Sequence, residues 1–243
     1  MSVPRPAFHR SATLKLLGVG FLALLMAIPL TMLEGLRRER EARRGEAERA
    51  LASSFGDAQR IGAPLLRVPV ETRVAQSDGS TRLRRTWFYQ VPDRVDGDAD
   101  LTIERRRRGI FELPVYQAKV VLATRFAHSR SGFGEIDGEA QWAQAELVIG
   151  ISDPRGLREI GADFAATKPT PAESLGEGPG GLPLFRLASV ALDASDAALI
   201  GKVTLSVAGS RRFDWLPLAR DYRAHLRAPW SDPSFGGAFS PTH

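Results

Sequence analysis

An uncharged stretch near the N-terminus constrains this chain more than any other part of its sequence. The run Leu16–Leu33 reads LLGVGFLALLMAIPLTML, and no charged residue lies between Lys15 and Glu34. Its residues give a helix of roughly 27 Å, just enough to cross a hydrocarbon core of about 30 Å if the flanking side chains snorkel. A buried helix of a soluble protein is the alternative, but the run has no polar stripe, and Pro29 is tolerated in membrane helices. The run therefore predicts a transmembrane helix, with these side chains in the bilayer: Leu16, Phe21, Leu24, Leu25, Pro29 and Leu33.

The same run could belong to a cleaved signal peptide or to a retained anchor. Basic residues precede it, as in a signal peptide. Its exit reads IPLTMLEGL, however, with bulky residues where a signal peptidase requires small ones. The run is also longer than most signal-peptide cores, so we expect a retained anchor.

The charges around the run leave its orientation undecided. Counting basic residues alone favours a cytoplasmic C-terminal flank, because more of them lie after the run than before it. Against this, a short N-terminal tail before a first apolar helix usually enters as a signal-anchor, which exports the chain on its C-terminal side.

A charged segment comes after the apolar run. Residues 34–54 are rich in Glu, Arg and Ala, which are good helix formers, and pairs such as Glu34–Arg38 and Glu39–Arg43 have helical spacing. The segment predicts a helical stalk over residues 34–56 that ends near Gly56. Its apolar positions are too sparse to indicate a coiled coil.

From Ile61 the pattern changes to short β-prone segments separated by Gly, Pro and Asp. This pattern predicts a mainly β, antiparallel, sandwich-like domain. The segment 62–74 contains Pro64 and Pro69, which suits an edge or entry strand. SDGS at 77–80 predicts a hairpin turn, and 157–181 reads mostly as a long loop. The other expected strands are 83–91, 99–104, 110–127, 141–153, 182–194, 201–209 and 222–229.

Several classes of site are disfavoured by composition and spacing. The chain has no cysteine, and its four histidines are scattered, so a thiolate or histidine metal site is not expected. The acidic segment DRVDGDAD (93–100) invites a calcium site, but an EF-hand loop starting at Asp96 would have Leu101 sixth and Arg107 twelfth. We therefore interpret it as a turn between strands and expect no metal and no cofactor.

No catalytic motif stands out either. GEGPGG (176–181) precedes neither a lysine nor a helix pattern, and no serine lies in a G-x-S-x-G elbow. Paired carboxylates for glycoside chemistry depend on tertiary structure, so the sequence neither indicates nor excludes them. We expect a protein that is not an enzyme.

Four consecutive arginines form the most basic run: Arg105, Arg106, Arg107 and Arg108. The net charge is only +5, and arginine greatly outnumbers lysine, as GC-rich coding would also produce. Nucleic-acid modules need a recognition helix or exposed aromatic residues beside the basic patch, and the run lies between β segments instead. Nucleic acid is therefore not an expected partner. The run is either a solvated strand end or a contact with anionic lipid headgroups or a membrane partner.

The order of motifs resembles that of the CreD family of bacterial inner-membrane proteins. The resembling stretches, from roughly Leu16 to Pro241, are IPLTML (28–33), IGAPLLRVPV (61–70), residues 87–126, ELVIGISDPRGL (146–157) and APWSDPSFGGAFSP (228–241). Among them, the pattern W-x-x-P-S-F-x-G-x-F-x-P, from Trp230 to Pro241, is the most specific match, and RRRRGIFELPVY shows a basic run that leads through Gly-Ile-aromatic into a strand. No single motif is highly specific, but the ordered set is.

The resemblance implies one N-terminal membrane helix, a large β-rich periplasmic region and then further membrane helices. It implies export of the chain beyond residue 34, and a non-enzymatic role in cell-envelope integrity and stress, controlled by a two-component system and affecting β-lactam tolerance. It carries over no catalytic residues. The expected organisation is a cytoplasmic tail (1–15), a transmembrane helix (16–33), a stalk (34–56) and a periplasmic β-rich domain (57–243) in the inner membrane.

This chain departs from that pattern because it stops at His243, before the further membrane helices. We expect either a fragment or a shortened relative, and in a fragment an open sheet edge among the last strands. Two other functions stay open: an anchored periplasmic sensor that binds a ligand or partner, and an anchored periplasmic enzyme.

Overall fold

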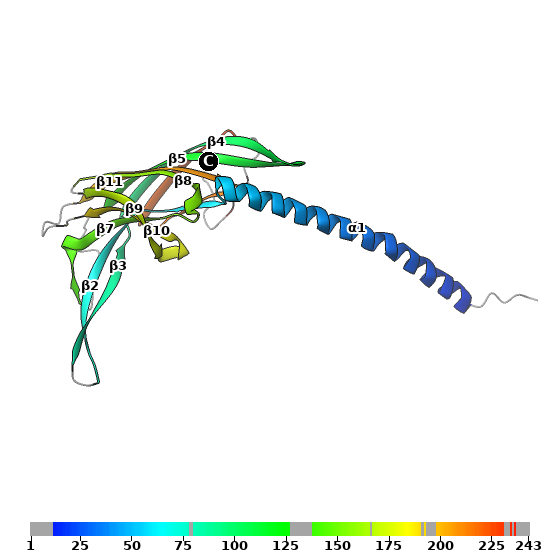
Figure 1. Ribbon diagram of the computed structural model, residues 1–243, viewed down its shortest axis with the longest axis horizontal. Coiled ribbons are helices and arrows are strands. Elements are labelled where there is room, and N and C mark those ends of the chain that lie inside the picture. Colours follow the sequence, from blue (N-terminus) through cyan, green and yellow to red (C-terminus); the bar gives the residue numbers. More distant parts are fainter. Residues whose placement is uncertain are drawn as a thin grey trace, which may run out of the picture. The chain divides into compact units, whose positions relative to one another are not determined.

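The structure, a computed structural model, describes residues 12–77, 80–126, 138–165, 167–190, 192, 198–230, 234 and 236. Two compact units divide the chain, residues 1–48 and residues 49–243. One long helix and a set of β-strands account for nearly all of the described residues (Figure 1).

The helix α1 runs without interruption over Ala12–Phe55 and includes Pro29. The segment Lys15–Ala47 contains a stretch that is long and apolar enough to cross a membrane. None of that stretch is buried. Among the side chains predicted to lie in the bilayer, Leu16, Leu24 and Leu33 are each more than 60 % exposed. The hydroxyl of Thr31 donates to the carbonyl oxygen of Ile28 at 2.8 Å, which satisfies a polar group within the apolar segment.

Beyond the apolar segment, ion pairs cross successive turns of α1. Arg38 lies 3.6 Å from Glu34, Arg43 lies 2.5 Å from Glu39, and Arg37 adds a pair with Glu41. The first two are the pairs that the helical spacing predicts. All of these side chains are well exposed, so each pair contributes only a few tenths of a kcal/mol, roughly.

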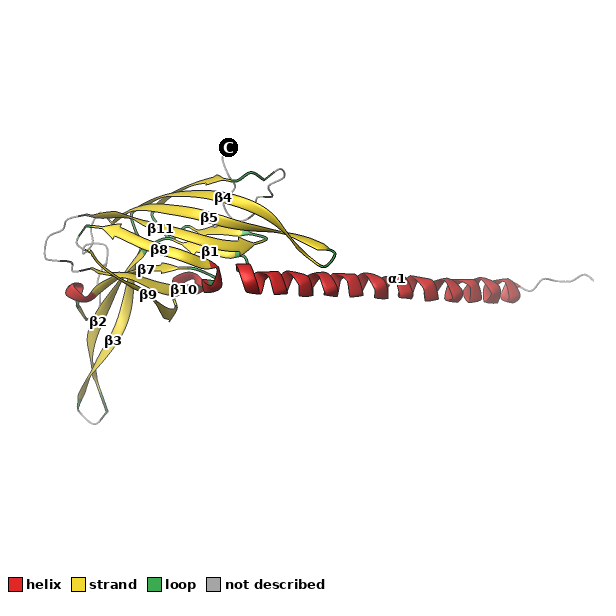
Figure 2. Cartoon of the chain, turned by 45° about the horizontal axis from the view of Figure 1, so that its top comes forward, coloured by secondary structure: helices red, strands yellow, loops and turns green. Residues whose placement is uncertain are grey.

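Two sheets form most of the second unit (Figure 2). The larger has the order β3-β2-β7-β10-β9, with β6 beside β2; the smaller has the order β13-β4-β5-β11-β8. The strands of the larger sheet are β2 (Leu65–Ala75), β3 (Thr81–Gln90), β6 (Glu139–Ala140), β7 (Ala145–Gly150), β9 (Thr167–Glu177) and β10 (Pro183–Val190). The strands of the smaller sheet are β4 (Arg94–Arg108), β5 (Phe111–Phe126), β8 (Leu157–Phe164), β11 (Leu199–Ser210) and β13 (Asp221–Arg227).

A short parallel pair completes the fold: β1 (Gln59–Gly62) lies beside β12 (Phe213–Leu216). The described residues also form the short 3-10 turns η2 (Trp142–Gln144), η3 (Pro154–Gly156) and η4 (Pro179–Gly181). Strand β13 is also parallel to its neighbour β4, while the other pairs between named strands are antiparallel.

The core lies between the two sheets. In β5, Val120 and Leu122 are buried, whereas Lys119 beside Val120 is exposed, which is the alternation expected of a strand with one wet face. Buried side chains from both sheets belong to one continuous cluster. The structure thus confirms the prediction of a mainly β, sandwich-like domain behind an apolar helix, and adds two parallel pairs to the expected antiparallel pattern.

The predicted loop at 157–181 is wrong, because this segment forms β8 and β9. Both are outer strands, one in each sheet. An outer strand buries few side chains, so its sequence carries little of the alternation that identifies a strand. β9 also contains Pro169 and Pro171, and an outer strand is where a sheet accepts proline.

Of the two alternatives for 62–74, an edge or an entry strand, the edge strand is wrong, because β2 lies between β3 and β7. Pro69 is accommodated there because β7 pairs with Leu65–Arg67 and β6 only with Val70 and Glu71. The missing N–H of Pro69 falls in the gap between these partners. The hairpin predicted at 77–80 does join β2 to β3, although Asp78 and Gly79 lie outside the described residues.

The last described strand, β13, is an outer strand of its sheet. For a fragment, we expected an open sheet edge among the last strands; β3, β8 and β9 are outer strands as well as β13.

Candidate functional site at the end of α1

The residue directly after α1 is Gly56, and no residue with a side chain fits at this position. Gly56 comes directly after Phe55 with φ +105°, a conformation that favours glycine after a helix. A Cβ placed on Gly56 would lie 2.6 Å from the carbonyl oxygen of Ala208 and 2.9 Å from the Cα of Gly156. The helix therefore ends where its chain packs directly against β11 and the turn η3.

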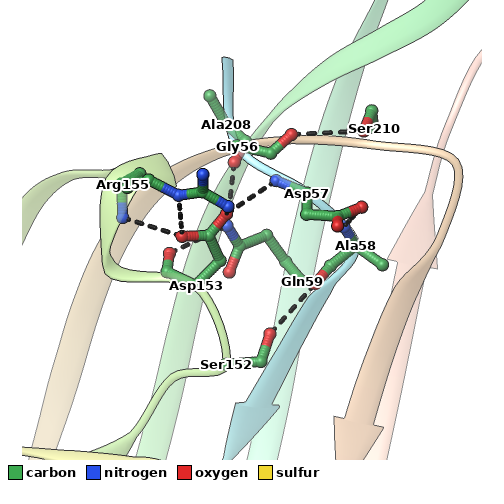
Figure 3. A network of polar contacts seen from close by, with 9 residues as sticks. All are labelled: Gly56, Asp57, Ala58, Gln59, Ser152, Asp153, Arg155, Ala208 and Ser210. Atoms are coloured by element: carbon green, nitrogen blue, oxygen red, sulfur yellow. Dashed lines mark hydrogen bonds and ion pairs between the residues drawn. The ribbon is translucent and has the colours of Figure 1, made fainter. Parts of the chain in front are cut away.

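Asp153 binds the segment that leaves the helix (Figure 3). Its Oδ2 accepts the backbone N–H of Asp57 at 2.8 Å. The same carboxylate accepts the backbone N–H of Arg155 at 3.1 Å and both arms of its guanidinium at 2.9 Å. Burial by itself would raise the pKa of Asp153, but the hydrogen bonds from Arg155 and Asp57 outweigh it and hold the pKa below its ordinary value.

The side chains of Ser152 and Ser210 form hydrogen bonds with backbone groups of residues 56–60. The hydroxyl of Ser152 donates to the carbonyl oxygen of Ala58 at 3.0 Å and accepts the N–H of Arg60 at 2.8 Å. The hydroxyl of Ser210 donates to the carbonyl oxygen of Gly56 at 3.2 Å. Together with Asp153, these side chains fix the five residues 56–60 to two other segments of the chain.

Gln59 lies at the centre of the junction and is fully buried. Its Nε2 donates to the carbonyl oxygens of Asp153 at 3.0 Å and Ala208 at 3.1 Å. Gly156 leaves room for it, because a Cβ there would lie 2.2 Å from this Nε2. The hydroxyl of Tyr116 accepts the N–H of Gln59 at 3.2 Å and donates to the carbonyl oxygen of Arg212 at 2.7 Å. We call Gly56–Arg60, Ser152, Asp153, Tyr116 and Ser210 the junction clamp.

An open cavity of about 600 Å³ lies beside the junction clamp. It is lined by Asp57, Ala58, Ser152, Asp153, Arg155, Arg211 and Arg212. Its groups are poorly suited to acid–base or nucleophilic chemistry. The Ser152 hydroxyl is engaged as donor and acceptor, and a carboxylate with a lowered pKa is a weak base. The arrangement is that of a structural attachment.

A second polar cluster lies on the larger sheet. Glu146 accepts from Arg67 at 2.9 Å and from Arg186 at 3.0 Å, and Arg186 also pairs with Glu173. Arg67 stacks 3.9 Å from the ring centre of Trp87. Both Glu146 oxygens accept from arginines, so this cluster also offers no free base.

Residues 94–100 lie on β4, so the prediction of a turn there is wrong for all of the segment except Asp93, which precedes the strand. Alternate residues Asp96, Asp98 and Asp100 share one face of β4. Arg94 pairs with Asp96 at 2.7 Å, and Arg227 of β13 pairs with Asp100 at 2.5 Å and approaches Asp98 at 3.8 Å. The hydrogen bond from Arg94 lowers the pKa of Asp96. In the part of the chain that the structure describes, no cluster of side chains is arranged to hold a metal ion.

The four consecutive arginines lie at the end of β4, in the hairpin that β4 forms with β5. Arg105 is opposite Pro114, Arg106 opposite Leu113 and Arg107 opposite Glu112. Arg106 pairs with Glu104 at 2.6 Å, and Arg107 pairs with Glu112. Arg108 is opposite Phe111 beside the turn. Arg105, Arg106 and Arg107 are exposed on this strand end, and none of these three is a member of the junction clamp.

Sequence reasoning singled out the apolar run and the arginine run but assigned no role to the clamp residues. A signal was present in ISDPRG, where Asp before Pro and Gly two residues later are typical of a capped turn. The partners of that turn lie far away in sequence; Asp57 and Asp153 are 96 residues apart. That distance is why the pattern did not indicate an attachment site.

Comparison with known proteins bears on identity. The chain matches the family described as Inner membrane protein CreD over residues 11–243. It is 26 % identical over 231 residues to the protein named Inner membrane protein CreD of Escherichia coli (strain K12), in a match that covers 90 % of this chain. The chain spans about half (49 %) of the length of that relative. No solved structure matches the chain significantly. The family match covers nearly the whole chain, so this protein belongs to the CreD family of inner membrane proteins.

Proposed function

We propose that this protein maintains cell-envelope integrity under stress, without being an enzyme, by holding a periplasmic β domain at the inner membrane. The observation that carries the proposal is the junction clamp. A membrane-type helix continues to Phe55, and from the next residue the chain is hydrogen-bonded to the sheets through Asp153, Ser152 and Ser210. Such an attachment suits a protein whose work is to hold a folded domain near a membrane.

Two observations support a role without catalysis. The serine and carboxylate at the clamp are engaged in attachment, and Glu146 is engaged by two arginines. Each group that could act as a nucleophile or base there already has a structural partner. The proposed partner of the helix is the lipid bilayer. A protein partner, if the domain has one, is expected among the other components of the cell envelope.

A second candidate function is a sensor that binds a ligand or partner. The observation favouring it is the open cavity of about 600 Å³ beside the clamp. Its lining of Asp57, Ser152 and three arginines suits a polar ligand rather than an apolar one.

The orientation of the domain is tested with reporter fusions. Alkaline phosphatase or green fluorescent protein is fused after residue 60, because residues 57–60 come directly after the helix. An exported domain gives phosphatase activity without fluorescence. Fluorescent cells without phosphatase activity would reverse the orientation and remove the periplasmic part of the proposal. A fusion after residue 10 serves as the matched control and should behave in the opposite way.

The envelope role is tested separately in the organism that carries the chain. Deleting the gene should lower survival in a membrane-disrupting detergent, and the wild-type gene should restore it. Survival that does not change on deletion would contradict an envelope role while leaving the membrane location intact.

A further inference from the structure

The end of the β4–β5 hairpin is a two-stranded ribbon that stands free of its sheet (Figure 2). On one side, β11 pairs with β5 only as far as Val115. On the other side, β13 pairs with β4 only as far as Asp100. Among the described residues, 105–114 therefore form strand pairs only with each other. We call these residues the ribbon.

An isoleucine occupies the tip of the ribbon without a structural reason. Gly109 and Ile110 form a two-residue turn, in which Gly109 has φ +60° at the first central position, as in a type II′ turn. The next position has no preference for a β-branched apolar residue. Ile110 is nonetheless 89 % exposed. Single exposed apolar side chains are common on protein surfaces, so Ile110 indicates a contact only together with the charges that accompany it.

Positive charge surrounds this isoleucine. Residues 104–112 contain four arginines and two glutamates, a net charge of +2. Arg106 and Arg107 each pair with one of the glutamates, which holds them along the ribbon. Arg105 is exposed and makes no ion pair within the described residues. An apolar residue flanked by arginines is complementary to an anionic lipid surface. The isoleucine side chain can enter the layer between headgroups and acyl chains, while the arginines bind lipid phosphates.

We propose that the ribbon binds the headgroups of anionic lipids in the bilayer that holds α1. The base of the ribbon contacts the end of that helix, where Arg106 lies 5.2 Å from the ring centre of Phe55. Because the ribbon and the end of the helix are on the same side of the membrane, the proposal holds for either orientation of the chain. It adds a lipid contact to the proposed function and does not rest on it.

The absence of cysteine from the chain allows a direct test. The full chain carrying Ile110→Cys is labelled with an environment-sensitive fluorophore. It is reconstituted into vesicles of phosphatidylcholine alone or of equal parts phosphatidylcholine and phosphatidylglycerol. In the anionic vesicles we expect a blue-shifted emission and several-fold lower quenching by aqueous iodide, and both effects should weaken as salt is added.

Two matched variants make the test specific. Arg105→Glu in the labelled protein should restore iodide quenching in anionic vesicles, whereas Arg158→Glu, an exposed arginine of β8, should leave it low. A label at Val121→Cys, 39 % exposed on β5, should remain in water in both vesicles.

Three results would overturn the proposal. The first is a label at residue 110 that stays in water in anionic vesicles. The second is equal protection in detergent micelles and in both vesicles, which would indicate contact with protein. The third is protection in native membranes that lipid vesicles do not reproduce, which would assign the ribbon to a protein partner.

Discussion

At the scale of single residues, the junction clamp depends on Asp153, where burial raises the pKa of the carboxyl and hydrogen bonding lowers it. Asp153 is nearly buried, yet it stays ionised because Arg155 and two backbone N–H groups donate to it. Leaving such a donor unpaired costs more than the bond itself contributes. The clamp is therefore sensitive to small chemical changes.

Asp153→Asn should lower the free energy of unfolding by about 1–3 kcal/mol at neutral pH, because the amide offers only one acceptor oxygen to four donors. Since the pKa of Asp153 is lowered by folding, its contribution is present above the ordinary carboxyl pKa and lost as pH falls through the folded value. The difference between variant and wild type should shrink in acid. Urea unfolding of the full chain in detergent micelles, followed by tryptophan fluorescence, measures both effects. Asp98→Asn, at an exposed carboxylate, should change little, and equal stability of Asp153→Asn and wild type would contradict the role of the clamp.

Two tyrosines offer a matched comparison. The Tyr116 hydroxyl bonds Gln59 and Arg212, whereas the buried Tyr222 hydroxyl has no partner among the described residues. Tyr116→Phe should cost about 1–2 kcal/mol, and Tyr222→Phe should be neutral or stabilising. Thermal unfolding measured by circular dichroism compares them. A larger loss for Tyr222→Phe would mean that its hydroxyl has a partner after all.

At the scale of elements, pairing between strands overrode several local signals. Asp and Gly in DRVDGDAD favour a turn, but β5 on one side and β13 on the other hold these residues extended. The opposing arginine of β13, Arg227, compensates two of the aspartates. By contrast, 110–127 was recognisable because alternation along β5 reflects its own burial on one face. A strand with one buried face shows an alternating pattern that predicts it from sequence. A strand that is extended only because it pairs with its neighbours shows no such pattern.

The ribbon should respond to a change at its turn independently of the sandwich. Gly109→Val places a β-branched residue at φ +60°, which should cost about 1–2 kcal/mol and open the ribbon. Hydrogen exchange should accelerate at the amides of residues 105–112 while those of β11 stay protected. Thr102→Val, on the same strand at an extended position, is the control. Unchanged exchange in the ribbon would show that Gly109 does not set the turn.

At the scale of the whole molecule, membrane residence and domain folding are separate properties. The apolar part of α1 makes no buried contact with the rest of the chain, so its side chains are free to interact with lipid. Family membership agrees with an inner-membrane location. The junction clamp lies entirely within the second unit, so it should form whether or not the helix is inserted.

Replacing Leu24 and Leu25 with arginine should prevent stable insertion, since each arginine at the centre of a membrane helix costs about 2.5–3.5 kcal/mol. Alkaline extraction of membranes should leave the wild-type chain in the pellet and release the double variant. Leu36→Arg together with Gly45→Arg, beyond the apolar run, should remain in the pellet. Retention of the Leu24→Arg/Leu25→Arg chain would contradict the assignment of the anchor.

The helix and the β class were already determined by the order of residues along the chain. An uncharged run of this length has to satisfy its backbone within a helix when it meets lipid, and one-sided burial imposes alternation on strands. The remaining features arose only when the chain folded. Folding brought Asp57 to Asp153, set β13 parallel to β4 and left the arginine run on a ribbon outside the sandwich. These features depend on which distant segments become neighbours. The local sequence around each residue does not specify its partner in a distant segment.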